Sequence, residues 1–399
     1  MDFPQPVSRR RFISGAAATA GILTLSPSEL EAFAQGTPQG TPAAQGGRGA
    51  PNEAEYDAFA KLSSNENCYG PPESVLQAMS RAMKYANRYG YPDGNIQQEI
   101  ANHHGVKPEN VLIGAGSGEL LDVVGLTFLD SNDKKVVGVE PSYGSVYQQA
   151  TTIKAGAVLV PLMADYRQDI PGLIKATKTH YREVGFVYLC NPNNPTGQIV
   201  TKKEVKHLLN EIPEDVPVLI DEAYHHFVDD DDYATSIPYV LEGRPVIIAR
   251  TFSKIAALAG MRLGYTIASK ELTTRMRAHM TGTVNAIVKH GGVAALKDTA
   301  SQAHVKQVTI DLRKKAVKEL KSLGYESIPS ETNFFMVHIK RPVQPVIAAF
   351  RQKGVLVGRP FPPMLEHLRV SVGTPEEMGR FAVAFREIFT GTGATGGSK

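Results

Sequence analysis

Three polar motifs follow directly after apolar runs in this 399-residue sequence, and their residue types could act together in one site. The runs GFVYLC, VPVLI and VIIAR lead into NPNNPTG, DEAY and TFSK. Ligands of open parallel sheets bind beyond the carboxyl ends of the strands. Asn-Pro and Pro-Thr-Gly also form turns by themselves, but three such motifs in succession favour a shared site. We therefore expect Asn194, Asp221, Tyr224 and Lys254 along one rim of one sheet.

Lys254 has the most informative surroundings. Lysine is strongly hydrated and is rarely buried without a partner, yet the stretch after Lys254 is mostly small or apolar. Thr251 and Ser253 precede it, and Arg262 follows it. These three side chains suit a phosphate, and a buried Asp221 requires a cation. Pyridoxal 5′-phosphate satisfies all of these demands, because its aldehyde bonds to a lysine and its pyridine nitrogen pairs with an aspartate.

The loop GAGSGE at 114–119 offers a further phosphate contact. It follows the run NVLI and precedes a helical pattern, and backbone N–H groups at such a helix start bind phosphate. The loop also resembles the dinucleotide fingerprint G-x-G-x-x-G, with Glu140 ending the next strand. Glu119 stands where that fingerprint has its last glycine, so we favour pyridoxal phosphate and keep a nicotinamide cofactor as the alternative.

The elements that position these motifs alternate along the chain from about residue 53. Near-continuous apolar runs separated by helical patterns, such as 117–129 and 202–211, indicate parallel strands buried on both faces. We predict an α/β fold, a three-layer domain with a mostly parallel sheet. The strand predictions are 110–113, 135–139, 157–160, 185–190, 216–220 and 246–250.

The pattern changes toward the C-terminus, which predicts a smaller α+β domain. Residues 303–323 carry an apolar helical stripe that stops at Gly324, and 334–339 and 368–372 have the character of strands. Thr374 and Glu377 form a capping box for a last helix. The predicted order is a signal peptide at 1–34, a Gly/Pro-rich linker at 35–52, an N-terminal arm that begins the small domain at 53–80, a large cofactor-binding domain at 81–285, the remainder of the small domain at 286–390, and a disordered tail at 391–399.

The first residues have the layout of an export signal. Ser8–Phe12, SRRRF, resembles the twin-arginine motif, and a modest apolar run to Leu25 follows it. AFAQ allows cleavage after Ala34, and the apolar run is shorter than the ~20 residues that a spanning helix needs. We expect export, with a periplasmic location; a membrane anchor or a basic tail of a cytoplasmic protein is the alternative.

Composition excludes several other classes of protein. The net charge is +3, and after the N-terminal segment there is no basic run flanked by aromatic residues, so a nucleic acid is not an expected partner. Cys68 and Cys190 are too few for a disulfide framework. The segment HHFVDDDD (225–232) contains metal-ligating residue types. Adjacent histidines on a strand point opposite ways and acidic runs are usually solvated, so no metal is predicted.

Residues from about 60 to 390 resemble the fold-type-I pyridoxal-phosphate aminotransferases, and most closely their histidinol-phosphate aminotransferase branch. The matching segments are KLSSNENCYGPP, YGYPDG, GAGSGELLD, PSYGSVY, CNPNNPTG, DEAY, TFSK with LAGMRLGY, and LRVSVGT. Their order and spacing match as a set. The resemblance implies transfer of an amino group between an amino acid, or an amino-phosphate compound such as histidinol phosphate, and a 2-oxo acid such as 2-oxoglutarate.

The resemblance also implies a role for each matching residue. Lys254 would be the Schiff-base lysine that moves the proton, Asp221 would pair with the pyridine nitrogen, and Tyr143 would stack on the ring. A homodimer is implied, with Tyr69 reaching the cofactor of the neighbouring subunit. The phenolic oxygen would be contacted by Asn194 and Tyr224, the phosphate by Ser117, Gly118, Thr251, Ser253 and Arg262, and the substrate carboxylate by Arg369. Glu119 is predicted as a further cofactor-binding residue. Arg359, where the sequence departs from the family, is predicted as a second substrate contact, with a surface arginine as the alternative.

Some positions depart from the family pattern. Cys68 replaces a usual proline, Gly118 a usual acidic residue and Ala257 a usual glycine, and the segment with Arg359 is shifted. These departures, with the export signal, leave histidinol phosphate open as the substrate. The alternatives are a decarboxylase or C–S/β-lyase on the same fold, or a non-catalytic protein that binds pyridoxal phosphate.

Overall fold

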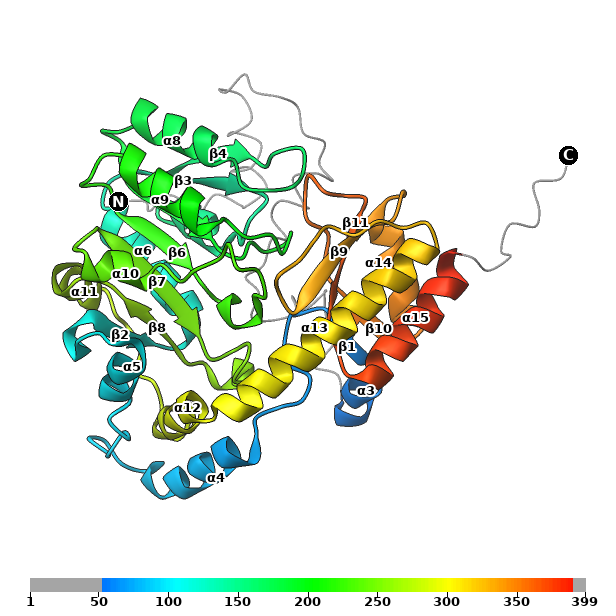
Figure 1. Ribbon diagram of the computed structural model, residues 1–399. Helices are drawn as coiled ribbons and strands as arrows, with labels where there is room; N and C mark the ends of the chain where they lie inside the picture. The colour runs from blue at the N-terminus through cyan, green and yellow to red at the C-terminus, as the bar shows by residue number, and fades with distance from the viewer. Residues whose placement is uncertain (1–51, 390–399) are drawn as a thin grey trace, which may run out of the picture. The chain divides into compact units, whose positions relative to one another are not determined.

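The computed structural model describes residues 52–389, which include a seven-stranded sheet and a smaller group of strands and helices (Figure 1). The predicted export signal, almost all of the linker and the predicted tail lie outside the described residues. The strands of the large sheet are β2 Val111–Gly114, β3 Lys135–Glu140, β4 Gly156–Pro161, β5 Val184–Cys190, β6 Val218–Asp221, β7 Val246–Thr251 and β8 Gly264–Ile267.

The sheet order confirms the expected rim. The strands lie in the order β2-β8-β7-β6-β5-β3-β4, so β5, β6 and β7 are direct neighbours. These three strands pair in parallel, with Cys190 opposite Asp221 and Asp221 opposite Ala249. Their carboxyl ends therefore meet at one edge. Of the strands in this sheet, β8 alone was not predicted. It pairs antiparallel with both β2 and β7, whereas the other neighbouring strands pair in parallel, so the sheet is mostly parallel.

Helices cover both faces of the sheet and complete three layers. Alternate strand residues enter two different apolar clusters: Val187 and Ile220 contact one, whereas Phe186 and Leu219 contact the other. The first cluster is covered by α5 Ile96–His104, α8 Ile170–Thr179, α9 Lys202–Glu211, α10 Ile237–Leu241 and α12 Ala286–Lys297. The second is covered by α6 Gly116–Phe128, α7 Ser145–Thr152 and α11 Lys270–Arg277.

A separate apolar cluster marks the smaller domain. It is built on β9 Phe334–His338 paired antiparallel with β11 His367–Ser371, and on β1 Ala60–Leu62 paired in parallel with β10 Val355–Val357. Its helices are α13 Thr299–Ser322, α14 Val343–Gln352 and α15 Pro375–Phe389, while α3 Glu53–Asp57 and α4 Glu73–Ala82 flank β1 in the sequence.

The chain passes from the core of the large sheet to the core of the small domain along α13, and not at residue 286, where the sequence predicts the C-terminal part to begin. We placed the beginning of the C-terminal part at 286, but α12 packs against α4 and α5 and contributes Val288 to the core of the large sheet. Val305 of α13 also contacts that core, whereas Leu320 belongs to the small-domain cluster. One 24-residue helix thus runs between both cores.

Local signals explain the helix ends of the small domain. The Thr374 N–H donates to Glu377 Oε2 at 2.9 Å and the Glu377 N–H to Thr374 Oγ1 at 3.2 Å, so the predicted capping box of α15 is confirmed.

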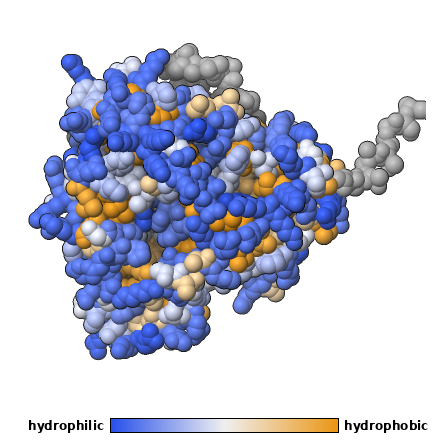
Figure 2. Space-filling model, viewed as in Figure 1, coloured by the Kyte–Doolittle hydropathy of each residue, from blue (hydrophilic) through white to orange (hydrophobic). Residues whose placement is uncertain are grey.

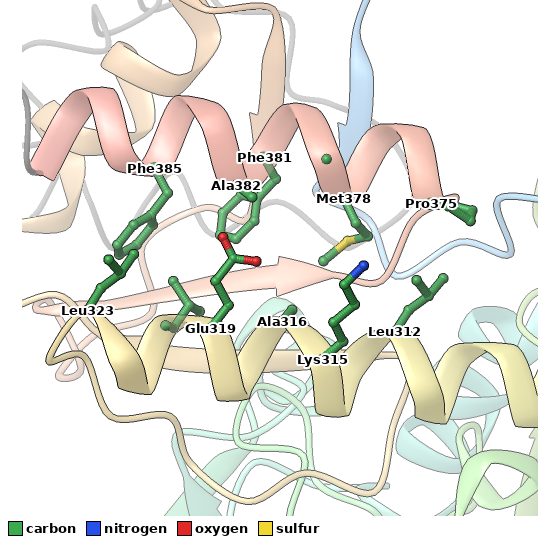
Figure 3. A pocket seen from close by; sticks show the side chains of 12 residues that line it. Leu312, Lys315, Ala316, Glu319, Leu323, Pro375, Met378, Phe381, Ala382 and Phe385 are labelled. Carbon is green, nitrogen blue, oxygen red and sulfur yellow. The ribbon is translucent and has the colours of Figure 1, made fainter.

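An apolar groove with Lys315 and Glu319 among its lining residues separates α15 from α13 (Figure 3). None of the predicted site residues lines it.

The described helices and the surface can be compared with what a membrane-spanning segment requires. Among residues 52–389, no helix is both long and apolar enough to cross a membrane. On the face drawn in Figure 2 hydrophilic side chains predominate and apolar ones form separate patches. This agrees with a sequence in which 21% of the residues are charged.

Candidate active site

The rim of β5, β6 and β7 brings the predicted chemical groups together. Asp221 ends β6 and is 3% exposed, with its carboxylate accepting from the Ala223 N–H at 3.1 Å and from the Tyr188 hydroxyl at 3.4 Å. Burial raises the pKa of Asp221 to about 6, although these hydrogen bonds and the positive charge of Lys254 oppose the shift. A carboxylate held in this way favours a cationic partner.

Lys254 lies directly after β7, within electrostatic reach of Asp221. Its Nζ donates to the Ser64 carbonyl at 3.3 Å and stands 5.5 Å from the centre of the Tyr224 ring. Burial lowers the pKa of Lys254 to about 8, and the positive charge of Arg369 acts in the same direction. The amine therefore loses its proton much more readily than an ordinary lysine, as a nucleophile or base requires.

The predicted phosphate residues lie close together at the start of α6. Thr251 Oγ1 donates to Ser253 Oγ at 2.9 Å, and Arg262 Nη1 donates to the same oxygen at 3.3 Å. The guanidinium lies against the glycine loop, since a Cβ added at Gly116 would stand 2.2 Å from Arg262 Nη2. Gly116 also has a φ of +82°, a region that favours glycine. Two hydroxyls, a guanidinium and a helix N-terminus thus converge.

The other loop residues lie beside this site in different ways. A Cβ on Gly118 would stand 3.8 Å from Arg262 Nη2, and one on Gly264 would stand 2.4 Å from the Ser117 nitrogen. Glu119 turns its carboxylate to the backbone, accepting from the Ala115 N–H at 2.6 Å and from the Gly282 N–H at 3.1 Å. It therefore holds the loop, and its predicted direct contact with a cofactor stays a prediction.

Tyr143 and Tyr224 line the site from two sides. Tyr143 packs against the α6 side of the sheet, and burial followed by the nearby Asp221 charge raises its pKa to about 12. The Tyr224 oxygen accepts from Asn194 Nδ2 at 3.4 Å and from Asn65 Nδ2 at 3.1 Å. The sequence had not singled out Asn65, which is 0% exposed although it is polar.

Two arginines approach the site from the small domain. Arg369 on β11 is 1% exposed and donates to Asn194 Oδ1 at 2.8 Å and to the Ser63 carbonyl at 2.6 Å. Its guanidinium lies 4.6 Å from the centre of the Phe361 ring, and that of Arg359 lies 4.4 Å from the same ring. Both predicted substrate residues thus stand over one aromatic ring, with Arg359 exposed to solvent.

A buried ion pair on the other face of the strand ends was also missed. Arg250 donates to Glu222 Oε2 through Nε at 3.1 Å and Nη2 at 2.6 Å, and the two side chains are 4% and 1% exposed. Each stands one residue from a predicted site residue, Asp221 or Thr251. A signal was available, because a charge inside the apolar run VIIAR requires a buried partner.

The two remaining sequence features lie away from the rim or at the surface. Tyr69 is 41% exposed and contacts none of the site residues through a hydrogen bond described within residues 52–389. His225 and His226 lie in a short 3-10 helix with ring centroids 3.7 Å apart, so the expectation that they point opposite ways on a strand is wrong. No group of three or more His, Cys, Asp or Glu residues in the described chain is placed to hold a metal ion.

The sequence matches the family described as aminotransferase class I and II over residues 58–385. The chain belongs to this family. It is 36% identical over 335 residues to the histidinol-phosphate aminotransferase of Moorella thermoacetica, covering 82% of this chain and 85% of that protein. It is 33% identical to histidinol-phosphate aminotransferase 2 of Pasteurella multocida, covering 82% of this chain and 89% of that protein.

Solved structures share the fold. The crystal structure of histidinol-phosphate aminotransferase from Sinorhizobium meliloti in complex with pyridoxal-5′-phosphate has a TM-score of 0.79 at 27% identity, covering 88% of this chain and 97% of that one. L-Threonine-O-3-phosphate decarboxylase from Porphyromonas gingivalis has a TM-score of 0.71 at 20% identity, covering 83% and 99%, which shows the fold alone. The predicted three-layer α/β fold of the fold-type-I pyridoxal-phosphate aminotransferases is confirmed.

The aminotransferase is pyridoxal-phosphate dependent, and its residues fit that cofactor. The glycine at 116 leaves room for the Arg262 guanidinium at a helix start, which suits the phosphate. A buried Asp221 suits the protonated ring nitrogen, and a lysine with a lowered pKa suits the aldehyde. The predictions of cofactor and enzyme class are confirmed, and the nicotinamide alternative for GAGSGE is set aside.

Proposed function

We propose that this aminotransferase moves an amino group between an anionic amine, either an amino acid or an amino-phosphate compound such as histidinol phosphate, and a 2-oxo acid. The observation that carries the proposal is the pair of guanidinium groups of Arg369 and Arg359 over the Phe361 ring. Burial lowers the pKa of Arg369 to about 10. A buried cation next to a second arginine is stabilised by an anionic substrate.

The side chains of the rim divide the work. When bound, pyridoxal phosphate supplies an aldehyde that bonds to amines and a ring that accepts electrons. Lys254 Nζ would take the proton from the substrate α-carbon and return it, since its pKa of about 8 leaves part of it neutral near pH 7. Asp221 would keep a proton on the ring nitrogen, and Thr251, Ser253 and Arg262 would hold the phosphate.

The test is a screen of donors against acceptors with the purified holoenzyme. Glutamate, neutral amino acids and histidinol phosphate are incubated with it one at a time, and pyridoxamine phosphate and the carbonyl product are measured. We expect pyridoxamine phosphate from donors that carry a carboxylate or a phosphate group. Arg359→Met should raise KM for these donors more than it lowers kcat. Release of carbon dioxide or elimination products without pyridoxamine phosphate would favour the decarboxylase or lyase alternative.

We further propose a homodimer in which Tyr69 reaches the partner's cofactor phosphate. Four large apolar or aromatic side chains between residues 69 and 89 are exposed in this chain, which supports a covering partner. They are Tyr69, Leu76, Met83 and Tyr89. Sedimentation should give twice the mass of one chain, and Tyr69→Phe should weaken cofactor retention without changing that mass; a monomeric active enzyme would exclude the arrangement.

The export signal is proposed from the sequence alone. The support is the SRRRF motif followed by an apolar run and a small-residue cleavage site. The twin-arginine route is understood to carry folded proteins, so the cofactor could be bound before export. Changing Arg9 and Arg10 to lysine should leave the protein in the cytoplasm, and equal fractionation of variant and parent would exclude this route.

A further inference from the structure

The segment Ser63–Asn67 crosses between the two cores and is bound from both sides. Its backbone carbonyls accept hydrogen bonds from Arg369 and Asn333 of the small domain and from Lys254 at the rim. Asn65 is the only residue of the segment that is 0% exposed. A fully buried amide must have its donors and acceptors satisfied, so the partners of Asn65 decide how its side chain is oriented.

Ser371 fixes the orientation of the Asn65 amide. The Asn65 backbone N–H donates to Ser371 Oγ at 2.8 Å, and the Ser371 hydroxyl donates to Asn65 Oδ1 at 2.8 Å. A serine hydroxyl has one hydrogen, and this geometry commits it to Oδ1. The oxygen of the amide therefore faces Ser371, and the NH₂ group faces the Tyr224 hydroxyl at 3.1 Å.

Arg369 fixes the orientation of the Asn194 amide in the same way. Arginine carries only donors, so the Asn194 atom that lies 2.8 Å from Arg369 Nη1 is the oxygen. The Asn194 NH₂ group then faces the Tyr224 oxygen at 3.4 Å. Two amides thus donate to one phenol oxygen, and each is oriented by a residue of β11.

This arrangement leaves one use for the Tyr224 hydrogen. The oxygen accepts twice, and within residues 52–389 no described hydrogen bond has Tyr224 as its donor. We propose that Ser371 and Asn65 are positioning residues, which hold Tyr224 as the donor to the phenolic oxygen of bound pyridoxal phosphate. The proposal rests on the assignment of this rim as the pyridoxal phosphate site.

The electrostatics of Tyr224 agree with this geometry. Burial raises the pKa of the Tyr224 hydroxyl, whereas the positive charge of Arg369 and the hydrogen bond from Asn65 act in the opposite direction. Donors on the oxygen therefore make the hydroxyl a better donor in turn. The charged or titratable neighbours that face Tyr224 are Asp221, Cys190, Arg369 and Lys254, and the variants below change none of them.

The test is a pH titration of the visible absorbance of the cofactor bonded to Lys254. A donor to the phenolic oxygen favours its charged form, so losing the donor should raise the midpoint. Ser371→Ala frees the Asn65 amide to rotate, and we expect a rise of about one pH unit, a tenfold change in the proton equilibrium. Asn65→Gly removes the donor without adding a charge, and should raise the midpoint by a similar amount.

Two controls separate positioning from packing. Ser371→Thr keeps the hydroxyl and should titrate like the parent enzyme. Ser327→Ala removes a hydroxyl that has no hydrogen-bond partner in the described chain, and should also leave the midpoint unchanged.

The outcomes distinguish the inference from the function on which it rests. A parent enzyme without a titrating visible band would overturn the cofactor assignment itself. A normal parent with an unchanged midpoint in either Ser371→Ala or Asn65→Gly would overturn the inference. So would an equal rise in Ser371→Thr, because packing rather than the hydroxyl would then be responsible. If Ser371→Ala does not fold, Asn65→Gly decides alone, since glycine readily adopts the φ of +54° at this position.

Discussion

Asp221 should destabilise the cofactor-free protein, and the effect should depend on pH. Its carboxylate is 3% exposed and has a hydroxyl and one backbone N–H as its hydrogen-bond donors. Burial raises its pKa from 3.8 to about 6. Replacement by asparagine keeps the shape and the acceptor for the Ala223 N–H, but removes the charge.

The sign follows from proton linkage. The folded chain binds this proton more tightly than the unfolded chain, so the free energy of unfolding falls as the pH rises from 3.8 to about 6. One pKa unit corresponds to about 1.4 kcal/mol, so the charged Asp221 costs about 3 kcal/mol at pH 8. Cofactor-free Asp221→Asn should be more stable than the parent by about 3 kcal/mol at pH 8 and about half of that at pH 5.

Urea unfolding of cofactor-stripped proteins at both pH values measures this gain. Asp130→Asn, which removes an exposed carboxylate just after α6, is the control for the loss of a charge at the surface. With pyridoxal phosphate bound the order should reverse, because the asparagine cannot pair with a protonated ring nitrogen. An equal gain at pH 5 and pH 8, or none at either, would refute the reasoning.

Three further predictions follow from neighbouring features. Capture of pyridoxal phosphate by the cofactor-free protein should speed up with pH through a midpoint near pH 8, the pKa of Lys254. Stopped-flow absorbance measures the rate, and a midpoint above pH 10, as for an ordinary lysine, would contradict the prediction. Glu222→Gln should lower the free energy of unfolding by about 3–5 kcal/mol, since it leaves the Arg250 charge buried, and adding Arg250→Met should restore most of the loss in urea unfolding. Ala257→Gly should raise that free energy by about 1 kcal/mol, because the φ of +57° at Ala257 costs an L-residue roughly 1–2 kcal/mol and glycine loses ~0.4–1 kcal/mol through the unfolded chain; an unchanged thermal unfolding curve would contradict it.

The parts of the fold that the sequence predicted are those with strong local patterns. The runs of β5, β6 and β7 are long and apolar, and each is followed by polar residues, so both the strands and their shared rim could be inferred. The capping box of α15 is a local signal as well. In contrast, β1 (AKL) and β8 (GYTI) are interrupted by polar residues or glycine and do not form a continuous apolar run, and β10 has three residues.

The missed site residues depend on contacts that are distant in sequence. Asn65 and Ser371 are 306 positions apart, and nothing near either one indicates the other. Arg250 and Glu222 could have been paired from their burial, but only once β6 and β7 were known to be neighbours. Ala257, which departs from the family's glycine, is explained only by its backbone: it adopts the left-handed conformation in a turn closed by the Lys254 carbonyl.

The position of Arg369 and Ser371 on one strand has a consequence for how such an enzyme can diverge. The two residues are two positions apart on β11: Arg369 is the residue proposed to bind the substrate, and Ser371 is linked through Asn65 to Tyr224. An exchange at Arg369 that admits a new substrate also releases the Asn194 amide, and with it one donor to Tyr224. A substitution at Arg369 that changes the substrate range should therefore also change the pH dependence of the enzyme. An engineer who alters the first should expect to have to adjust the second.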